Sequence, residues 1–140
     1  MRLIVLDTNV VVSAGIRSDG PPGILIDDWV LSGRVQMVTC PRIVLEYRVV
    51  VWREKFRRHG FPPAWLDLMI RDSLQLSDPP GWPHPLPDPK DAPFLALAHT
   101  AGAWLVTGNL RHFPKTARRG VTVLSPAEYL SHLQESSPRP

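Results

Sequence analysis

The sequence predicts an α/β domain in which a mostly parallel sheet is covered by helices on both sides. Short apolar segments alternate along the chain with helix-forming segments, an order that requires right-handed crossovers between parallel strands. The first segment, Leu3–Leu6, is apolar throughout and ends at Asp7, as expected of a strand buried on both faces. A length of 140 residues corresponds to one ordinary domain. We therefore expect a single domain over residues 1–134 and a frayed tail over residues 135–140.

The remaining elements follow from the spacing of apolar residues and from the residues that begin and end helices. Gly20, Pro21 and Pro22 separate the first two helices, and Pro41 is suited to the first turn of a third. Residues 78–89 are so rich in proline that we expect a stiff loop. The expected strands are 3–6, 35–38, 73–77, 104–107 and 121–124, and the expected helices are 10–16, 23–31, a helix from 41, 65–70, 88–100 and a helix from 126.

Composition and charge restrict the classes of function. With 44% hydrophobic and 21% charged residues, the chain is neither wholly disordered nor a coiled coil. Sixteen Lys and Arg against 13 Asp and Glu give a net charge of +3, which suits a polyanionic partner if acids gather at one site. The lone Cys40 can form neither an internal disulfide nor a zinc cluster, and the apolar run before Asp7 is too short for a signal peptide or a membrane span. We expect a cytoplasmic protein with no membrane segment.

Four short motifs carry the functional prediction. They are Asp7, Thr8 and Asn9 after LIVL, Glu46 in VLEYRVVV, Asp91 in DPKDAPFLALA, and Thr107 and Asn109 in VTGNLRHF. In parallel sheets ligands bind beyond the carboxyl ends of the strands, where Asp7 and Asn109 are expected. Together the motifs resemble the PIN-domain nucleases over residues 2–130, and most of all the VapC-like proteins identified as toxin components of toxin-antitoxin pairs.

The resemblance implies a three-layer α/β/α sandwich with a five-stranded parallel sheet, cleavage of RNA phosphodiesters with Mg²⁺ or Mn²⁺, a small antitoxin protein as partner, and a homodimer. The family's first three acids fall on Asp7, Glu46 and Asp91. Where many members have a fourth acid, this chain has Asn109, which offers only a neutral carbonyl oxygen. Gathered carboxylates repel one another unless a cation is present, and Mg²⁺ and Mn²⁺ take oxygen ligands. We expect catalysis by the three acids and one bound ion at rest.

Several residues near these motifs have two interpretations. Asp88 could be a further metal ligand or a helix N-cap, and Glu46 could instead pair with Arg42. Thr8, Asn9 and Thr107 could orient ligands or satisfy the backbone. Two basic groups could bind RNA phosphates or form a solvated face: Arg53–Arg58 with His59, and a group at the rim of the site made of Arg111, His112, Lys115, Arg118 and Arg119.

Two other functions remain open from the sequence. A haloacid-dehalogenase-like phosphatase also begins with a strand and an aspartate, but it needs a second acid two residues later, where this chain has Asn9. The other is a catalytically weakened PIN fold that binds RNA or a protein. No glycine-rich phosphate loop follows the first strand, which excludes nucleotide-binding Rossmann and P-loop folds. For a homodimer, the helix face with Trp65, Leu68 and Met69 is one candidate surface, although these residues could equally belong to the core.

Overall fold

The computed structural model describes residues 2–53, 59–60 and 63–136. Five strands form one sheet in which every pair is parallel, in the order β3-β2-β1-β4-β5. The strands are β1 (Leu3–Leu6), β2 (Gln36–Thr39), β3 (Leu74–Gln75), β4 (Trp104–Val106) and β5 (Val123–Leu124). The central strand β1 pairs with β2 and β4, with Leu6 opposite Val106 at its carboxyl end. The predicted five-stranded parallel sheet is confirmed.

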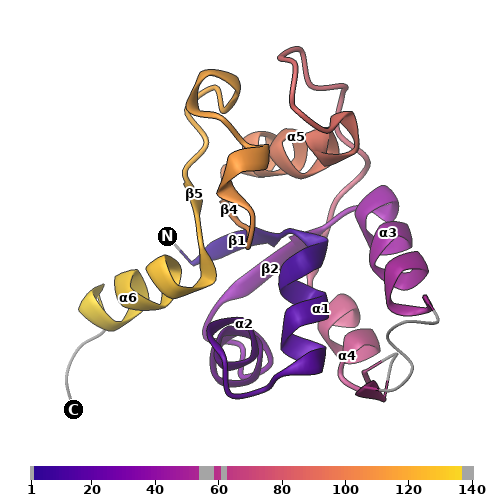
Figure 1. Ribbon diagram of the computed structural model, residues 1–140, viewed down its shortest axis with the longest axis vertical. Coiled ribbons are helices and arrows are strands. Elements are labelled where there is room, and N and C mark those ends of the chain that lie inside the picture. The colour runs from indigo at the N-terminus through magenta and orange to yellow at the C-terminus, as the bar shows by residue number, and fades with distance from the viewer. Residues whose placement is uncertain (1, 54–58, 61–62, 137–140) are drawn as a thin grey trace.

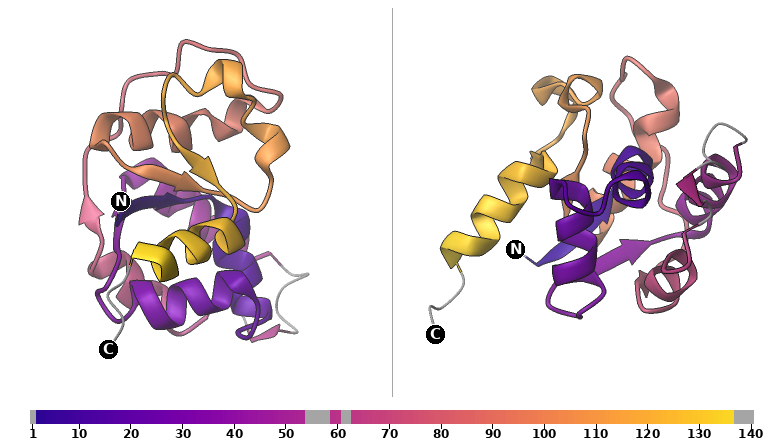
Figure 2. Two further views of the ribbon diagram at one scale, coloured as in Figure 1. Left: turned by 90° about the vertical axis from the view of Figure 1, so that its left-hand side faces the viewer. Right: turned by 60° about the horizontal axis from the view of Figure 1, so that its bottom comes forward.

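Helices cover both faces of this sheet. They are α1 (Thr8–Ile16), α2 (Pro21–Ile24), α3 (Pro41–Val51), α4 (Leu66–Arg71), α5 (Ala92–Ala101) and α6 (Pro126–Ser136). In Figure 1, α5 lies on one side of the sheet, and α1 and α2 lie on the other. Figure 2 shows the same layers from two further directions, with α6 beside α2. The α/β/α sandwich expected from the sequence is therefore present.

Several boundaries differ from the prediction. The helix expected at residues 23–31 begins earlier, as α2 at Pro21, and continues as a π-helical segment, Leu25–Val30. Prolines are tolerated there because the first-turn N–H groups have no partner within a helix. Gly23 packs so closely on the preceding turn that an added Cβ would lie 2.4 Å from the Ser18 carbonyl oxygen. At the other end, α6 runs to Ser136, past the expected start of the frayed tail, and residues 137–140 lie outside the described residues.

The core is built from the sheet and the inner faces of the helices. Ile4, Val5 and Leu6 of β1 are completely buried, which confirms that this strand is covered on both faces. Phe94 and Leu97 of α5 are likewise buried. Each such side chain contributes about 1.5–3 kcal/mol of burial free energy. These contacts hold the carboxyl end of β1, and therefore Asp7, in a rigid setting.

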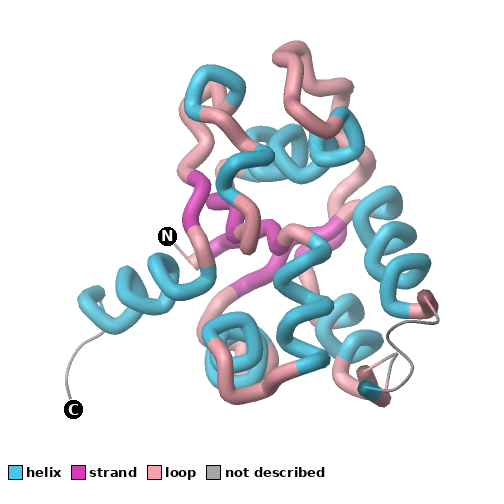
Figure 3. Tube along the Cα trace, in the orientation of Figure 1, coloured by secondary structure: helices cyan, strands magenta, loops and turns pink. Residues whose placement is uncertain are grey.

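The proline-rich segment has no regular structure, as expected. Figure 3 shows it as loop between β3 and the short 3₁₀ turn Pro89–Asp91 that leads into α5. Among the residues that the structure describes, no helix combines the length and the apolar character that crossing a bilayer requires.

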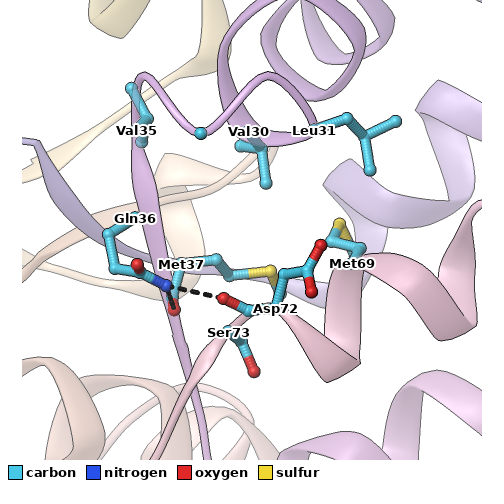
Figure 4. A pocket seen from close by; sticks show the side chains of 9 residues that line it. Val30, Leu31, Val35, Gln36, Met37, Met69, Asp72 and Ser73 are labelled. Atoms are coloured by element: carbon cyan, nitrogen blue, oxygen red, sulfur yellow. Dashed lines mark hydrogen bonds between the residues drawn. The ribbon is translucent and has the colours of Figure 1, made fainter.

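A small cavity lies at the amino end of β2, away from the carboxyl edge of the sheet. It has a volume of about 60 Å³ and is lined by residues from the turn before β2 and from the end of α4. Two of the lining residues are joined by a hydrogen bond, in which the Gln36 side-chain amide donates to the Asp72 carbonyl oxygen at 3.0 Å (Figure 4). This cavity is too small for a nucleotide, and a larger one, of about 340 Å³, is lined by Glu46 of α3 and Phe94 of α5.

Candidate functional site

Asp7 lies at the carboxyl end of the central strand, directly before α1. Its backbone N–H continues the ladder to β4 by donating to the Val106 carbonyl oxygen at 2.9 Å. Only 5% of the residue is exposed. The Thr107 hydroxyl donates to Asp7 Oδ2 at 2.8 Å, and the Asn9 amide donates to the same oxygen at 3.3 Å. Two neighbouring side chains thus hold the orientation of this buried carboxylate.

The surroundings of Asp7 make its charged form unfavourable. Burial raises the pKa of Asp7 to about 6, the Thr107 hydrogen bond lowers it in part, and the charges of Asp91 and Glu46 raise it further. The pKa of Asp91 is also raised, first by burial, against the lowering effect of His112. The acids predicted from three separate motifs are therefore close enough to repel one another. Such a set is stabilised by a cation.

Glu46 reaches the site from α3. The Thr8 hydroxyl donates to Glu46 Oε2, so the residue after Asp7 in the chain holds the second acid. The backbone N–H of Arg42 donates to Asp78 Oδ1 at 2.9 Å, and no ion pair between Arg42 and Glu46 is found among the described residues. In the part of the chain that the structure describes, the recorded partner of the Glu46 carboxylate is Thr8 rather than Arg42.

The next residue on α3, Tyr47, lies directly beneath the site. Its hydroxyl donates to the carbonyl oxygen of Leu6, the residue before Asp7. Burial, followed by the charges of Asp7 and Glu46, raises the pKa of Tyr47 well above its usual value, so the hydroxyl stays protonated. Tyr47 thereby fixes α3 to the end of β1.

The turn after β4 is joined to the start of α1 by side-chain hydrogen bonds. Asn9 Oδ1 accepts from the Gly108 N–H at 2.9 Å, and Thr107 Oγ1 accepts from the Asn109 N–H at 3.0 Å. A Cβ at Gly108 would lie 3.2 Å from Asn9 Oδ1, which is tighter than ordinary contact. Asn9 and Thr107 thus do both things considered for them: each contacts Asp7 and each accepts from a backbone N–H of the turn. The Thr8 hydroxyl contacts an acid, Glu46.

Asp91 precedes α5 and is paired with a histidine from the turn after β4. His112 Nδ1 lies 2.9 Å from Asp91 Oδ2, and the Asp91 side chain is 14% exposed. Asp88 accepts from the Lys90 N–H at 3.0 Å and begins the 3₁₀ turn, as the N-cap interpretation predicts. Its charge still raises the pKa of Asp91.

The donor set is that of a hard divalent cation, because carboxylate oxygens dominate it. Among the described residues, however, no three His, Cys, Asp or Glu side chains are arranged to hold one ion together. The arrangement fits an ion that is bound by one or two carboxylates and completes its coordination with water, as Mg²⁺ commonly does. Asn109, the predicted neutral ligand, is joined to the site through its backbone N–H.

The basic residues at the rim divide into two kinds. Arg111 and Lys115 are exposed, whereas Arg118 donates from Nε to the Phe113 carbonyl oxygen at 2.8 Å. His112 faces Asp91 rather than only solvent. Of the other basic group, residues 54–58 lie outside the described residues.

The sequence did not predict the contacts of His112 and Tyr47. His112 was expected at the rim as a phosphate contact, and its pairing with Asp91 depends on how two loops meet. For Tyr47 the sequence predicted only a place in the helix that begins at residue 41. Its position directly after Glu46 was the one available signal, since a buried tyrosine hydroxyl needs a hydrogen-bond partner.

Comparison with known proteins identifies the family. The family model described as "PIN domain" matches residues 3–111. Of the solved structures, PAE2754 from Pyrobaculum aerophilum is similar with a TM-score of 0.60 and 16% identity, covering 95% of this chain and 90% of that one. The structure of FitAB bound to an IR36 DNA fragment is similar with a TM-score of 0.54 and 19% identity, covering 88% and 94%. No curated protein matches the sequence. At these identities the two structures support the fold, while the family model supports membership: the chain belongs to the PIN-domain family.

Proposed function

We propose that this protein is a divalent-metal-dependent endoribonuclease whose catalytic acids are Asp7, Glu46 and Asp91. PIN domains are generally nucleases, so membership of this family favours a nuclease over the haloacid-dehalogenase-like phosphatase. The observation that carries the proposal is the Asp7 carboxylate, which is 5% exposed at the carboxyl edge of the sheet and whose pKa is raised by burial and by both other acids. A bound cation would stabilise the ionised form of a carboxylate that is buried beside two other acids.

Each acid is held by a different neighbour. Asp7 is the central metal ligand, oriented by Thr107 and Asn9. Glu46 is oriented by Thr8, and Asp91 by His112. Asn109 and Asp88 contribute more weakly, one as a neutral oxygen and the other through its charge. Mg²⁺ or Mn²⁺ bound here would lower the pKa of a coordinated water and offset the charge that builds on the phosphate.

The substrate is an RNA strand that crosses the carboxyl edge of the sheet. Arg111 and Lys115 are exposed in the segment that follows Asn109, which supports a role for them in binding RNA phosphates on one side of the acids. His112 belongs to this rim and also orients Asp91. In this proposal, residues 109–115 contribute both to phosphate binding and to the metal site.

The proposal predicts that cleavage depends on charge at Asp7 and Glu46. Asp7→Asn and Glu46→Gln each remove one charge with little change of shape, and should lower the Mn²⁺-dependent cleavage rate by about 100-fold or more. Glu135→Gln, the same change at an exposed position of α6, should leave the rate unchanged. The assay is cleavage of single-stranded and structured RNA in Mn²⁺, in Mg²⁺ and in EDTA. Equal cleavage by wild type and Asp7→Asn would identify a contaminant and refute the proposal.

Asn109 favours one alternative, a PIN fold that binds RNA or a protein without cutting. Loss of the fourth acid removes a negative charge from the turn after β4. The same assay separates the two functions: the binding module would retain RNA in a filter-binding measurement and release no cleaved product from wild type in Mn²⁺ or Mg²⁺.

We also propose that the protein is the toxin of a toxin-antitoxin pair in the cytoplasm. The resemblance to VapC-like proteins supports the role of a toxin that is held inactive by a small antitoxin protein, and the single buried Cys40 suits the reducing cytoplasm. A gene for a small protein next to this one would support the pairing.

Homodimerisation requires an exposed apolar face, and the face expected on α4 is largely core. Met69 is 2% exposed and Trp65 half-buried, which leaves only Leu68 well exposed. A better candidate lies on α3 and its C-cap, where Leu45, Val49 and Trp52 are 63%, 55% and 60% exposed and are spaced as one helical stripe. We propose that two copies pair through this stripe.

Disrupting the stripe should therefore change the oligomeric state. Val49→Arg places a charge at its centre and should convert a dimer to a monomer in sedimentation velocity, with the circular dichroism spectrum unchanged. Ile16→Arg, at a residue of α1 that is 43% exposed, is the control and should leave the dimer intact. A wild-type protein that is monomeric at 100 micromolar, roughly a hundred times a micromolar dissociation constant, would contradict the proposal.

A further inference from the structure

The proline-rich loop, residues 78–88, contacts the elements that carry two of the acids. It leaves β3, passes the start of α3 and reaches the turn before α5, where Asp91 lies. A cavity of about 220 Å³ on its inner side is lined by the loop, by Arg42 of α3 and by Ala92 and Ala96 of α5. The loop therefore bridges the helix that carries Glu46 and the helix that follows Asp91.

Asp78 joins the first end of the loop to α3. Its Oδ1 accepts from the Arg42 backbone N–H at 2.9 Å. The first N–H groups of a helix have no partner within it, and the residue at the N-cap of α3, Cys40, makes no capping hydrogen bond with its side chain. Asp78 thus supplies a cap from a distant part of the chain and fixes the loop to the helix that carries Glu46.

Trp82 joins the middle of the loop to the other side of the site. Its Nε1–H donates to the Ala117 carbonyl oxygen at 2.8 Å. Its ring meets His99 of α5 edge-on, with centroids 5.5 Å apart. Ala117 lies in the same segment as His112, which pairs with Asp91. One tryptophan therefore links the loop both to α5 and to the segment that orients Asp91.

We propose that Asp78 and Trp82 are positioning residues, and that the loop acts as a brace that sets the separation between Glu46 and Asp91. Prolines suit this role, because they restrict the backbone and lower the entropy lost when the loop is ordered. In the proposed nuclease these two acids flank the ion held by Asp7, directly or through its coordinated water, so a change in their separation alters metal affinity before it alters the fold. The inference thus rests on the proposed function for its consequence, but the brace itself is a statement about geometry.

Two variants should loosen the brace while leaving the three proposed catalytic acids unchanged. Asp78→Ala removes the acceptor for the Arg42 N–H, and Trp82→Phe removes the indole N–H but keeps an aromatic ring. Each should weaken Mn²⁺ binding by about tenfold, measured by isothermal titration calorimetry. Asp78→Asn keeps a side-chain oxygen that can accept, and should restore affinity to within about twofold of wild type. Leu130→Ala, at a buried residue of α6 remote from the brace, is the control for a general loss of stability.

A second measurement is independent of metal. Spin labels at Arg48→Cys on α3 and Thr100→Cys on α5 report the separation of the two helices by pulsed electron resonance. The buried Cys40 is kept because its thiol contacts Asp78, and the labelled protein is diluted with unlabelled protein. The distance distribution should broaden in Asp78→Ala and Trp82→Phe but not in Leu130→Ala. Distributions that match wild type in both brace variants would overturn the brace, whether or not the protein binds Mn²⁺. If they broaden while wild type neither binds Mn²⁺ nor cuts RNA, the brace stands and the proposed function fails.

Discussion

Asp7→Asn should make the metal-free protein more stable at neutral pH, while abolishing its stabilisation by Mn²⁺. The folded pKa of Asp7 is about 6, above the ordinary value of 3.8, so the folded state binds this proton more tightly than the unfolded state does. Stability from this group is therefore greatest below pH 3.8 and is lost as the pH rises through about 6. Above pH 7 the ionised, buried carboxylate destabilises the fold by about 3 kcal/mol, and asparagine lacks that charge.

The measurement is thermal and urea unfolding in EDTA between pH 4 and pH 8. A gain of about 3 kcal/mol corresponds to roughly 6–12 °C in Tm for a domain of this size, and it should vanish near pH 4. Mn²⁺ should raise the Tm of wild type and leave Asp7→Asn unchanged. Asp27→Asn, at an exposed aspartate, should change stability by less than about 0.5 kcal/mol at every pH. An Asp7→Asn protein that is no more stable than wild type at pH 7.5 would show that the ionised carboxylate does not destabilise the fold.

Asn109→Asp should increase both metal binding and catalysis. The Asn109 N–H donates to Thr107 Oγ1, which in turn donates to Asp7, so a carboxylate here would add negative charge two residues from Thr107, a side chain that contacts the central acid. We expect a second Mn²⁺ to bind and the cleavage rate to rise about tenfold, equivalent to about 1.4 kcal/mol of barrier.

Without metal, the added charge should destabilise the folded protein. It should raise the pKa of Asp7 further and lower stability in EDTA at pH 7.5, with the loss reversed by Mn²⁺. Isothermal titration gives the number of ions bound, and Asn109→Ala, which adds no charge, is the matched control. One bound ion and an unchanged rate in Asn109→Asp would mean that this turn does not contribute to the metal site.

The basic group after Asn109 and the α4 face illustrate what sequence patterns leave undecided. Arg118 and Arg111 lie in the same basic segment, yet Arg118 binds the Phe113 carbonyl oxygen while Arg111 is exposed. Leu68 and Met69 are adjacent on α4, yet one is 47% exposed and the other 2%. A pattern of residue types shows which face of a helix is apolar, but it does not show what packs against that face. The direction of each side chain depends on neighbours that are distant in sequence.

What the sequence by itself determined is the parallel α/β fold, the burial of the first strand and the placement of Asp7 at its end. These follow from local properties, namely apolar runs, helix-breaking residues and the order of strands and helices, and the parallel sheet and the buried β1 confirm them. Only the tertiary structure decided how the acids are held, because those contacts join residues far apart in the chain: Thr107 to Asp7, Thr8 to Glu46 and His112 to Asp91. The same holds for Asp78 and Trp82, whose partners lie on α3 and beyond β4. Hydrogen bonds depend on distances of a few tenths of an ångström, and those are set by the packing of the whole domain rather than by local sequence.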